Sequence, residues 1–196
     1  MTSMTSEATK NARVGIMSRP PAAREKILDA YANLLRSDGE RAATMDATAA
    51  LAGVSKGGLL YHFPSKDALA EAVIERLLDA AQQDSERMAT APEGAARYYV
   101  RTSTVEETEF DAFYQAVVRL AAGSHAPAVT ALDQVHADWE RLVREDVSDP
   151  HAAEAIMLIG EGLYYHSTMP GTWSRSLVGR DIGALLEQVD RLKKGS

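Results

Sequence analysis

The chain contains no cysteine, so a disulfide framework, a thiolate metal site and a thiol nucleophile are all excluded. No apolar stretch approaches the ~20 residues of a membrane span, and residues 1–20 lack the apolar core of a secretory signal. We therefore expect a soluble, cytoplasmic protein without membrane contact. The 196 residues suffice to bury a sizeable core without a metal or a cross-link.

Signals of catalysis are also scarce. No Gly-rich phosphate loop follows a strand pattern, and Ser, His and Asp are too common in this chain to propose a triad. His151 and Glu154 have the spacing of two metal ligands, but no second pair matches them. His125, His136 and His166 are most simply surface or pocket-wall residues. We expect no enzyme activity, no cofactor and no bound metal.

Positive charge is in the minority, since the formal net charge is −7, and this value alone argues against a polyanionic partner. This net value hides an uneven distribution of charge along the chain. Residues 1–66 hold nine Lys/Arg and six Asp/Glu, a net charge of +3, whereas the remainder holds twelve basic and 22 acidic residues, a net charge of −10. A basic head on an acidic body is expected when only the head contacts phosphates.

Alternating strand patterns and internal repeats are missing as well, and apolar periodicity predicts an all-α protein. Residues 1–19 are rich in Ser and Thr, so we expect a disordered arm. The arm either has no role or strengthens nucleic-acid binding through Lys10, Arg13 and Arg19. The expected helices span residues 22–37, 45–52, 56–63, 65–88, 93–104, 106–122, 126–146, 150–168 and 181–194.

Two short helices separated by a glycine turn form the most informative stretch. Thr44 is a good N-cap for the first helix, and Gly53 suits a turn that needs a left-handed residue. Ser55 can cap the second helix, while Leu59 and Phe63 can pin it to a core. This is the plan of a helix-turn-helix, whose second helix enters the major groove of DNA. We therefore expect residues 20–66 to form a three-helix DNA-binding domain.

The outward face of the second short helix begins with two residues that lack side chains. Gly57 and Gly58 each weaken a helix by roughly 1 kcal/mol relative to alanine, but their missing side chains let the backbone approach bases or the sugar-phosphate wall. Tyr61 could instead be half-buried in the core, His62 could lack a role, and Lys56 could simply be solvated. The face left for duplex DNA comprises Ser55, Lys56, Gly57, Gly58, Leu60, Tyr61 and His62.

The run TMDATAALAGVSKGGLLYHFPSKDAL, residues 44–69, resembles the DNA-binding region of the TetR (tetracycline repressor) family of bacterial transcription regulators. The preceding helix REKILDAYANLL, residues 24–35, and its Gly-containing loop share the resemblance, which covers roughly residues 22–75. Several residues that begin or end the helices agree with the family's pattern at fixed spacing, so the resemblance is highly specific.

The family's roles carry over position by position. The resemblance implies a phosphate contact at Thr44 and base reading with close backbone approach at residues 55–58. It also implies that Tyr61 and His62 pack against the sugar-phosphate wall and that Lys66 binds a phosphate. The chain departs from the family at Leu60, where many members carry tyrosine; leucine offers a thymine methyl contact but no hydrogen bond. The operator therefore cannot be copied from relatives.

Large apolar and aromatic side chains gather in residues 93–196. They form either a plain helical-bundle core or the wall of a mostly apolar cavity. The resemblance favours a cavity for a small effector, within an effector-binding and dimerisation domain of residues 67–196 in which helix 67–88 is the connection. The candidate lining residues are Tyr98, Phe110, Phe113, Tyr114, Trp139, Met157, Tyr164, Tyr165, His166, Met169 and Trp173.

The resemblance further implies that the last two long helices, 150–168 and 181–194, pair with a second subunit as a four-helix bundle. The sequence thus predicts a homodimeric DNA-binding regulator, most simply a repressor released from its operator by a small, largely apolar ligand. The alternative is a helical small-molecule-binding protein or enzyme with a vestigial DNA-binding head. The residues expected at the dimer interface are Gly160 and Gly162, which permit close approach, and Leu185, Leu186, Val189 and Leu192, which form an apolar face.

Overall fold

The computed structural model describes residues 20–104, 108–168 and 181–195, and within these ranges the chain forms helices and no strand, which confirms the all-α prediction. No helix in the described ranges is long and apolar enough to span a membrane. The helices in chain order are α1 (Pro20–Asp38), α2 (Met45–Ala52), α3 (Lys56–His62), α4 (Lys66–Ala89), α5 (Ala95–Thr102), α6 (Glu109–Ala122), α7 (Ala126–Asp146), α8 (Pro150–Thr168) and α10 (Ile182–Lys194).

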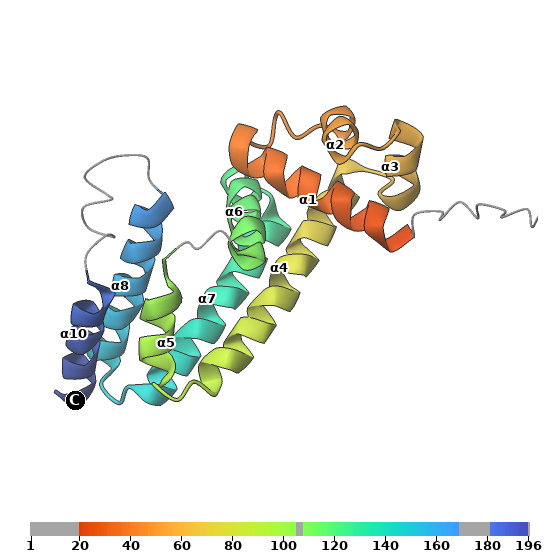
Figure 1. Ribbon diagram of the computed structural model, residues 1–196. Helices are drawn as coiled ribbons and strands as arrows, with labels where there is room; N and C mark the ends of the chain where they lie inside the picture. The colour runs from red at the N-terminus through yellow and green to blue at the C-terminus, as the bar shows by residue number, and fades with distance from the viewer. Residues whose placement is uncertain (1–19, 105–107, 169–180, 196) are drawn as a thin grey trace, which may run out of the picture.

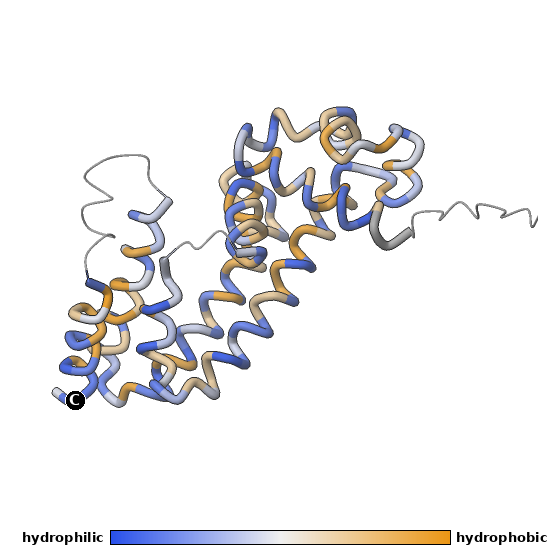
Figure 2. Tube along the Cα trace, viewed as in Figure 1, coloured by the Kyte–Doolittle hydropathy of each residue, from blue (hydrophilic) through white to orange (hydrophobic). Residues whose placement is uncertain are grey.

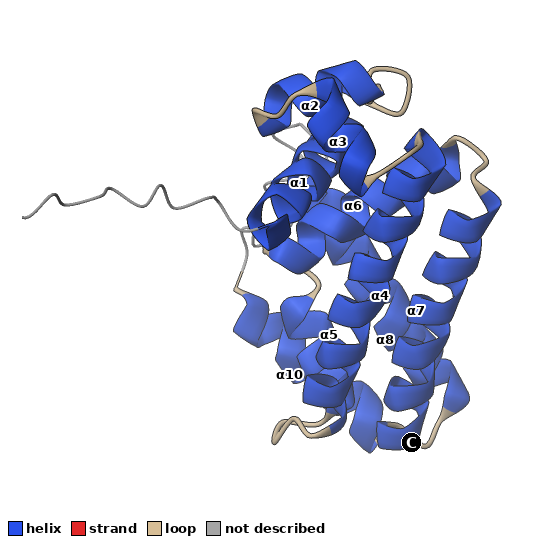
Figure 3. Cartoon of the chain, turned by 90° about the vertical axis from the view of Figure 1, so that its right-hand side faces the viewer, coloured by secondary structure: helices blue, strands red, loops and turns tan. Residues whose placement is uncertain are grey.

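The helices separate into a small head and a larger body. α1, α2 and α3 lie together at one end of the molecule, and α4 starts beneath them and runs along the body (Figure 1). α4, α6 and α7 pack against one another, while α5, α8 and α10 form the remaining part of the body (Figures 1 and 3). α1 also contacts α6, so the head rests on the body through α6 as well as through α4.

The helix starts of the head follow from the capping residues that the sequence indicates. The hydroxyl of Thr44 accepts the N–H of Ala47 at 3.2 Å, and Gly53 ends α2 with a φ of 67°. The hydroxyl of Ser55 accepts the N–H of Gly58 at 3.0 Å and so begins α3. Each of these bonds satisfies a helix-end group that would otherwise lack a partner.

One face of α3 is fixed to the head's core. Leu59 is 0% exposed and Phe63 is 3% exposed, which confirms that both residues belong to the core. Along α4 and α7, hydrophobic residues recur at short intervals between hydrophilic ones, as expected for helices with one buried face (Figure 2). Other buried residues of the core cluster in the head and at the start of α4 include Ile27, Leu28, Tyr31, Leu35, Ala49 and Leu69.

α5 begins later than the sequence indicates, at Ala95 rather than at residue 93. Gly94 precedes it with a φ of 87°, a left-handed conformation that interrupts the helix. The carboxylate of Asp146 accepts the N–H of Ala96 at 3.0 Å and binds the ammonium of Lys193 at 2.8 Å. The start of α5 is therefore set by residues about 50 and 100 positions away, which local sequence cannot reveal.

Candidate functional site

The outward face of α3 is open to solvent. A Cβ added at Gly57 would meet nothing within 4 Å, so the backbone there is bare. Tyr61 is 82% exposed and Leu60 is 41% exposed, so the alternative of a half-buried Tyr61 does not hold. The ring of half-buried His62 packs edge-on against Tyr61 with a centroid separation of 5.1 Å. α3 therefore presents a flat start followed by a projecting aromatic residue.

The two lysines of this surface are both held by carboxylate-bearing residues. The ammonium of Lys56 lies 2.9 Å from the carboxylate of Asp46 on α2, and both side chains are largely exposed. The ammonium of Lys66 donates to the backbone carbonyl of Glu40 at 2.8 Å and lies 3.6 Å from its carboxylate. Lys66 thus ties the start of α4 to the loop between α1 and α2. Any phosphate that these lysines bind must compete with Asp46 or Glu40.

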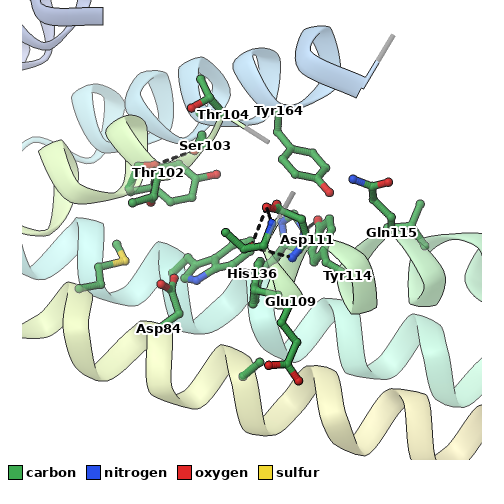
Figure 4. A pocket seen from close by; sticks show the side chains of 18 of the residues that line it. Asp84, Thr102, Ser103, Thr104, Glu109, Asp111, Tyr114, Gln115, His136 and Tyr164 are labelled. Atoms are coloured by element: carbon green, nitrogen blue, oxygen red, sulfur yellow. Dashed lines mark hydrogen bonds between the residues drawn. The ribbon is translucent and has the colours of Figure 1, made fainter. Parts of the chain in front are cut away.

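The body contains a cavity of about 1340 Å³. α4, α5, α6, α7 and α8 surround it (Figure 4). Arg36, at the end of α1, also lines it. Six of the candidate lining residues lie on this wall: Tyr98, Phe110, Tyr114, Trp139, Tyr164 and Tyr165.

Other candidate residues are not on the cavity wall. Phe113 is 2% exposed and Met157 is 8% exposed, both within the core of the body. Phe110 and Tyr114 are four residues apart and share one face of α6, whereas Phe113 faces a different direction, toward Arg76 of α4. His166 does not line the cavity, and Met169 and Trp173 lie outside the described residues.

Aromatic rings from several helices meet at Trp139. The rings of Phe110, Tyr114 and Tyr99 have their centroids 6.0, 6.0 and 5.8 Å from that of Trp139. Tyr164 of α8 contacts Tyr114 edge-on at 5.1 Å. These separations are typical of favourable aromatic pairs. The cavity therefore has an aromatic wall to which four helices contribute.

Polar groups cross this aromatic wall in a short chain. The Tyr114 hydroxyl lies 2.7 Å from Nε2 of His136 (Figure 4), and Nδ1 of His136 lies 3.6 Å from the carboxylate of Glu161. The three residues belong to α6, α7 and α8. With a neutral imidazole whose Nδ1 proton faces Glu161, Nε2 accepts the Tyr114 proton. The hydroxyl oxygen of Tyr114 then still has lone pairs available to a ligand.

Sequence reasoning missed some residues that shape the cavity. Tyr99 is 6% exposed and lines it, one position from the predicted Tyr98. A Cβ at Gly160 would overlap the ring of Tyr99, so this glycine makes room for α5 of the same chain. Around Gly162 nothing described lies within 4 Å of an added Cβ. The spacing of His136 and Trp139, i and i+3 on α7, was the available signal for the polar edge of the wall.

Burial of the tyrosines predicts an alkaline transition. Burial raises the pKa of Tyr114 to about 12, with a further contribution from the Glu161 carboxylate. Burial also raises the pKa of Tyr31, Tyr99 and Tyr164. Because these folded-state values exceed the unfolded value of about 10, the stability they confer is complete below pH 10. It is lost as the pH rises through the folded-state values.

We expect these tyrosines to ionise only together with unfolding, measured by tyrosinate absorbance alongside helical circular dichroism. Tyr114→Phe should remove one tyrosine from the group that ionises together with unfolding. The ionisation of the exposed tyrosines at lower pH should stay unchanged. Ionisation of all seven tyrosines near pH 10, with the helices intact, would contradict the burial of these rings.

Family models match both parts of the chain. The model described as "Bacterial regulatory proteins, tetR family" matches residues 27–73, and the model described as "Tetracyclin repressor-like, C-terminal domain" matches residues 93–190. The HTH-type transcriptional regulator RutR of Escherichia coli K12 is 33% identical over 145 residues, which are 72% of this chain and 66% of RutR. The chain thus spans slightly less than two thirds of the length of this relative.

Solved structures share the fold. Salmonella enterica GusR has a TM-score of 0.64 at 20% identity, covering 91% of this chain and 98% of GusR. A regulator from Streptomyces coelicolor A3(2) has a TM-score of 0.61 at 22% identity, covering 88% of this chain and 99% of its own. The multidrug binding protein EbrR, complexed with malachite green, has a TM-score of 0.57 at 20% identity, covering 87% and 97%.

Proposed function

The chain belongs to the TetR family of bacterial transcriptional regulators, and we propose that it is a cytoplasmic, homodimeric repressor that leaves its operator when a small, largely apolar molecule enters the body cavity. The observation that carries the DNA-binding part is the bare N-terminal face of α3. Gly57 is open to solvent while Leu59 and Phe63 anchor the opposite face. A recognition helix needs this combination, because its N-terminal residues must reach base edges from a rigid support.

The roles on this surface follow from position and chemistry. Residues 55–58 approach the bases, and Leu60 can contact a thymine methyl group. Tyr61 and His62 pack on the sugar-phosphate wall, where the projecting phenol can donate to a phosphate. The hydroxyls of Thr44 and Ser55 accept helix N–H groups, so their own protons remain available to phosphates.

Division of the chain into two domains supports a switch. In this proposal residues 20–66 bind DNA and residues 67–196 bind the effector and a second subunit. α4 starts at the head, and its residues from Arg76 to Met88 contribute to the cavity wall. A ligand that moves α4 therefore moves the head. The ligand acts as an inducer if it binds more tightly to the conformation whose two heads do not match successive major grooves.

Homodimerisation is required by the geometry of DNA. Two recognition helices must lie roughly 34 Å apart to enter successive major grooves of one duplex face. On α8, Leu158 is 61% exposed and Tyr165, seven residues later, is 53% exposed. Gly162 lies between them on the same helical face without a Cβ neighbour. This stripe, together with α10, is the surface that we assign to the partner subunit.

Capture of genomic DNA tests the proposed function. The purified chain is incubated with genomic fragments, the retained fragments are sequenced, and binding to the enriched site is measured as salt rises. Specific binding should persist at ordinary salt and weaken linearly on a double-logarithmic plot. Failure to enrich any sequence, with non-specific affinity only, would support a ligand-binding protein with a vestigial head and would defeat the proposal.

Replacement of Lys66 tests the phosphate contacts. We expect Lys66→Ala to weaken binding to all sequences alike and to reduce the salt slope by about one unit, because one counterion-releasing contact is lost. Arg144→Ala is the matched control, since this exposed cation lies on α7 in the body and, like Lys66, is held by a glutamate, Glu140. An unchanged slope in Lys66→Ala would assign Lys66 only to the bond with Glu40.

A further inference from the structure

Among the described residues, no counterion is paired with Arg36 at the cavity wall. This arginine lies in the last turn of α1, and its buried Nε has no hydrogen-bond partner within the described chain. It also forms no ion pair with a described residue. A buried donor that meets neither water nor an acceptor costs about 1–3 kcal/mol. In the described chain, the guanidinium of Arg36 therefore has an unsatisfied hydrogen-bond donor at the cavity.

Three other arginines of the cavity wall do form ion pairs. Arg76 is paired with Glu109, Arg87 with Asp84, and Arg101 with Glu93. Their charges are already neutralised by neighbouring carboxylates. Arg119, which is exposed on α6 and also lines the cavity, forms no ion pair with a described residue. Arg36 and Arg119 are therefore the two arginines of the cavity wall without an ion pair in the described chain.

Two further donors at the cavity lack acceptors. The indole Nε1 of Trp139, a side chain that is 9% exposed, and the hydroxyl of Tyr164 are buried without a hydrogen-bond partner in the described chain. Indole and guanidinium groups can only donate. These three donors therefore lack acceptors in the described chain although carboxylates also line the cavity, and the chemistry that would satisfy them is an oxygen-rich, negatively charged group.

Arg36 and Tyr164 act on the same part of the cavity. Burial raises the pKa of Tyr164 and the Asp111 carboxylate raises it further, whereas the side-chain amide of Gln115 and, to a smaller extent, the charge of Arg36 lower it. One oxygen of Asp111 accepts both the N–H and the hydroxyl of Thr108 in the capping box that begins α6. Tyr164 and Gln115 turn their polar ends toward each other, on the opposite side of the cavity from Asp84 (Figure 4).

We propose that the effector is an aromatic carboxylate whose carboxylate binds Arg36 and Tyr164 and whose ring lies against Phe110, Tyr114 and Trp139. This inference rests on the proposed function and narrows its largely apolar ligand to one with a single anionic group. A carboxylate accepts a bidentate pair of bonds from a guanidinium, which explains an arginine at this position. Tyr164 meets Tyr114 edge-on and Tyr114 is tilted against Trp139, and this chain of rings gives a planar body favourable contacts.

The position of Arg36 gives the contact a second consequence. Arg36 belongs to α1 of the head, whereas Tyr164 and the aromatic wall belong to the body. A carboxylate bound between them joins head and body through the ligand itself. Arg36 is thus both a ligand-binding residue and a positioning residue that can transmit occupancy to the head.

Binding of matched probes to the full chain tests the inference. The probes are benzoate, 2-naphthoate and indole-3-acetate, each compared with its carboxamide and with the corresponding methylammonium compound, by calorimetry and thermal shift. We expect at least one carboxylate to bind at least about tenfold more tightly than its carboxamide, as a charge-assisted bidentate pair implies. The ammonium compounds should bind most weakly.

Two variants locate the charge. Arg36→Met keeps the aliphatic stem and should abolish the preference for carboxylate over carboxamide. Arg87→Met is the control, because it removes an arginine of the same cavity that is already paired with Asp84, and it should keep that preference. If Arg36→Met does not fold, judged by circular dichroism, the probe series on the unaltered chain still decides the charge of the ligand.

Three results would overturn the inference: equal or tighter binding of the carboxamide or ammonium probes, an unchanged preference in Arg36→Met, or no binding of any carboxylate at roughly 1 mM. Operator binding without ligand is measured on the same preparations. Its absence would defeat the proposed regulator, whereas normal operator binding without carboxylate preference would defeat only this inference.

Discussion

Gly57→Leu should abolish specific operator binding while the protein stays folded. A Cβ added at this position meets nothing within 4 Å beyond its own stretch of helix, so a side chain there projects from the bare face of α3. On DNA it would hold the recognition helix away from the groove. Because each good base contact is worth about 1–3 kcal/mol, the loss of two or more should weaken specific binding by at least about a hundredfold.

The same substitution should not harm the fold. Leucine is a better helix former than glycine by roughly 0.8 kcal/mol, so the midpoint of thermal unfolding should stay the same or rise. Ala137→Leu provides the matched control, since it places a leucine on an exposed position of α7 in the body. Electrophoretic mobility shift and circular dichroism on both variants provide the comparison. Retained operator binding in Gly57→Leu would refute close approach at this glycine.

Much of the head could be predicted because local chemistry determines it. Thr44 and Ser55 cap the helices that follow them, and Gly53 adopts the left-handed conformation that the turn between α2 and α3 requires. Leu59 and Phe63 are buried at the spacing of one helical face. These features depend on residues within a few positions of each other, so the sequence alone contains the information.

The cavity could be predicted only in part, because its wall depends on how distant helices are rotated. Phe110 and Phe113 look alike in the sequence, but only Phe110 faces the cavity. Lys66 likewise looks like a free phosphate ligand until the carbonyl of Glu40, 26 residues earlier, is placed beside it. Arg36 carries no local signal at all, since its exceptional feature is a buried Nε that has no hydrogen-bond partner among the described residues.

The structure also changes which residues are expected at the dimer surface. The sequence places Leu185 on the apolar face of α10, but this side chain is half-buried against the core of its own chain. A charge at Leu185 would therefore disturb the fold and an interface at once. Leu158 on α8 is 61% exposed, so a charge there leaves the subunit's own packing largely intact.

Leu158→Glu should convert the dimer into folded monomers. Two glutamates brought together at a two-fold interface would lose hydration without a cationic partner, which costs several kcal/mol. The dimer dissociation constant should rise at least about a hundredfold, measured by sedimentation. Operator affinity should fall by a factor on the order of 10²–10⁴, because one head no longer holds the other near its half-site.

Val129→Glu separates this effect from the mere addition of charge. Val129 is also an exposed apolar residue, 42% exposed, but it lies on α7 outside the stripe of Leu158, Gly162 and Tyr165. This variant should remain dimeric and keep its operator affinity. A Leu158→Glu protein that sediments as a dimer would move the partner surface away from this stripe. The 34 Å spacing of the heads would then need another pair of helices to set it.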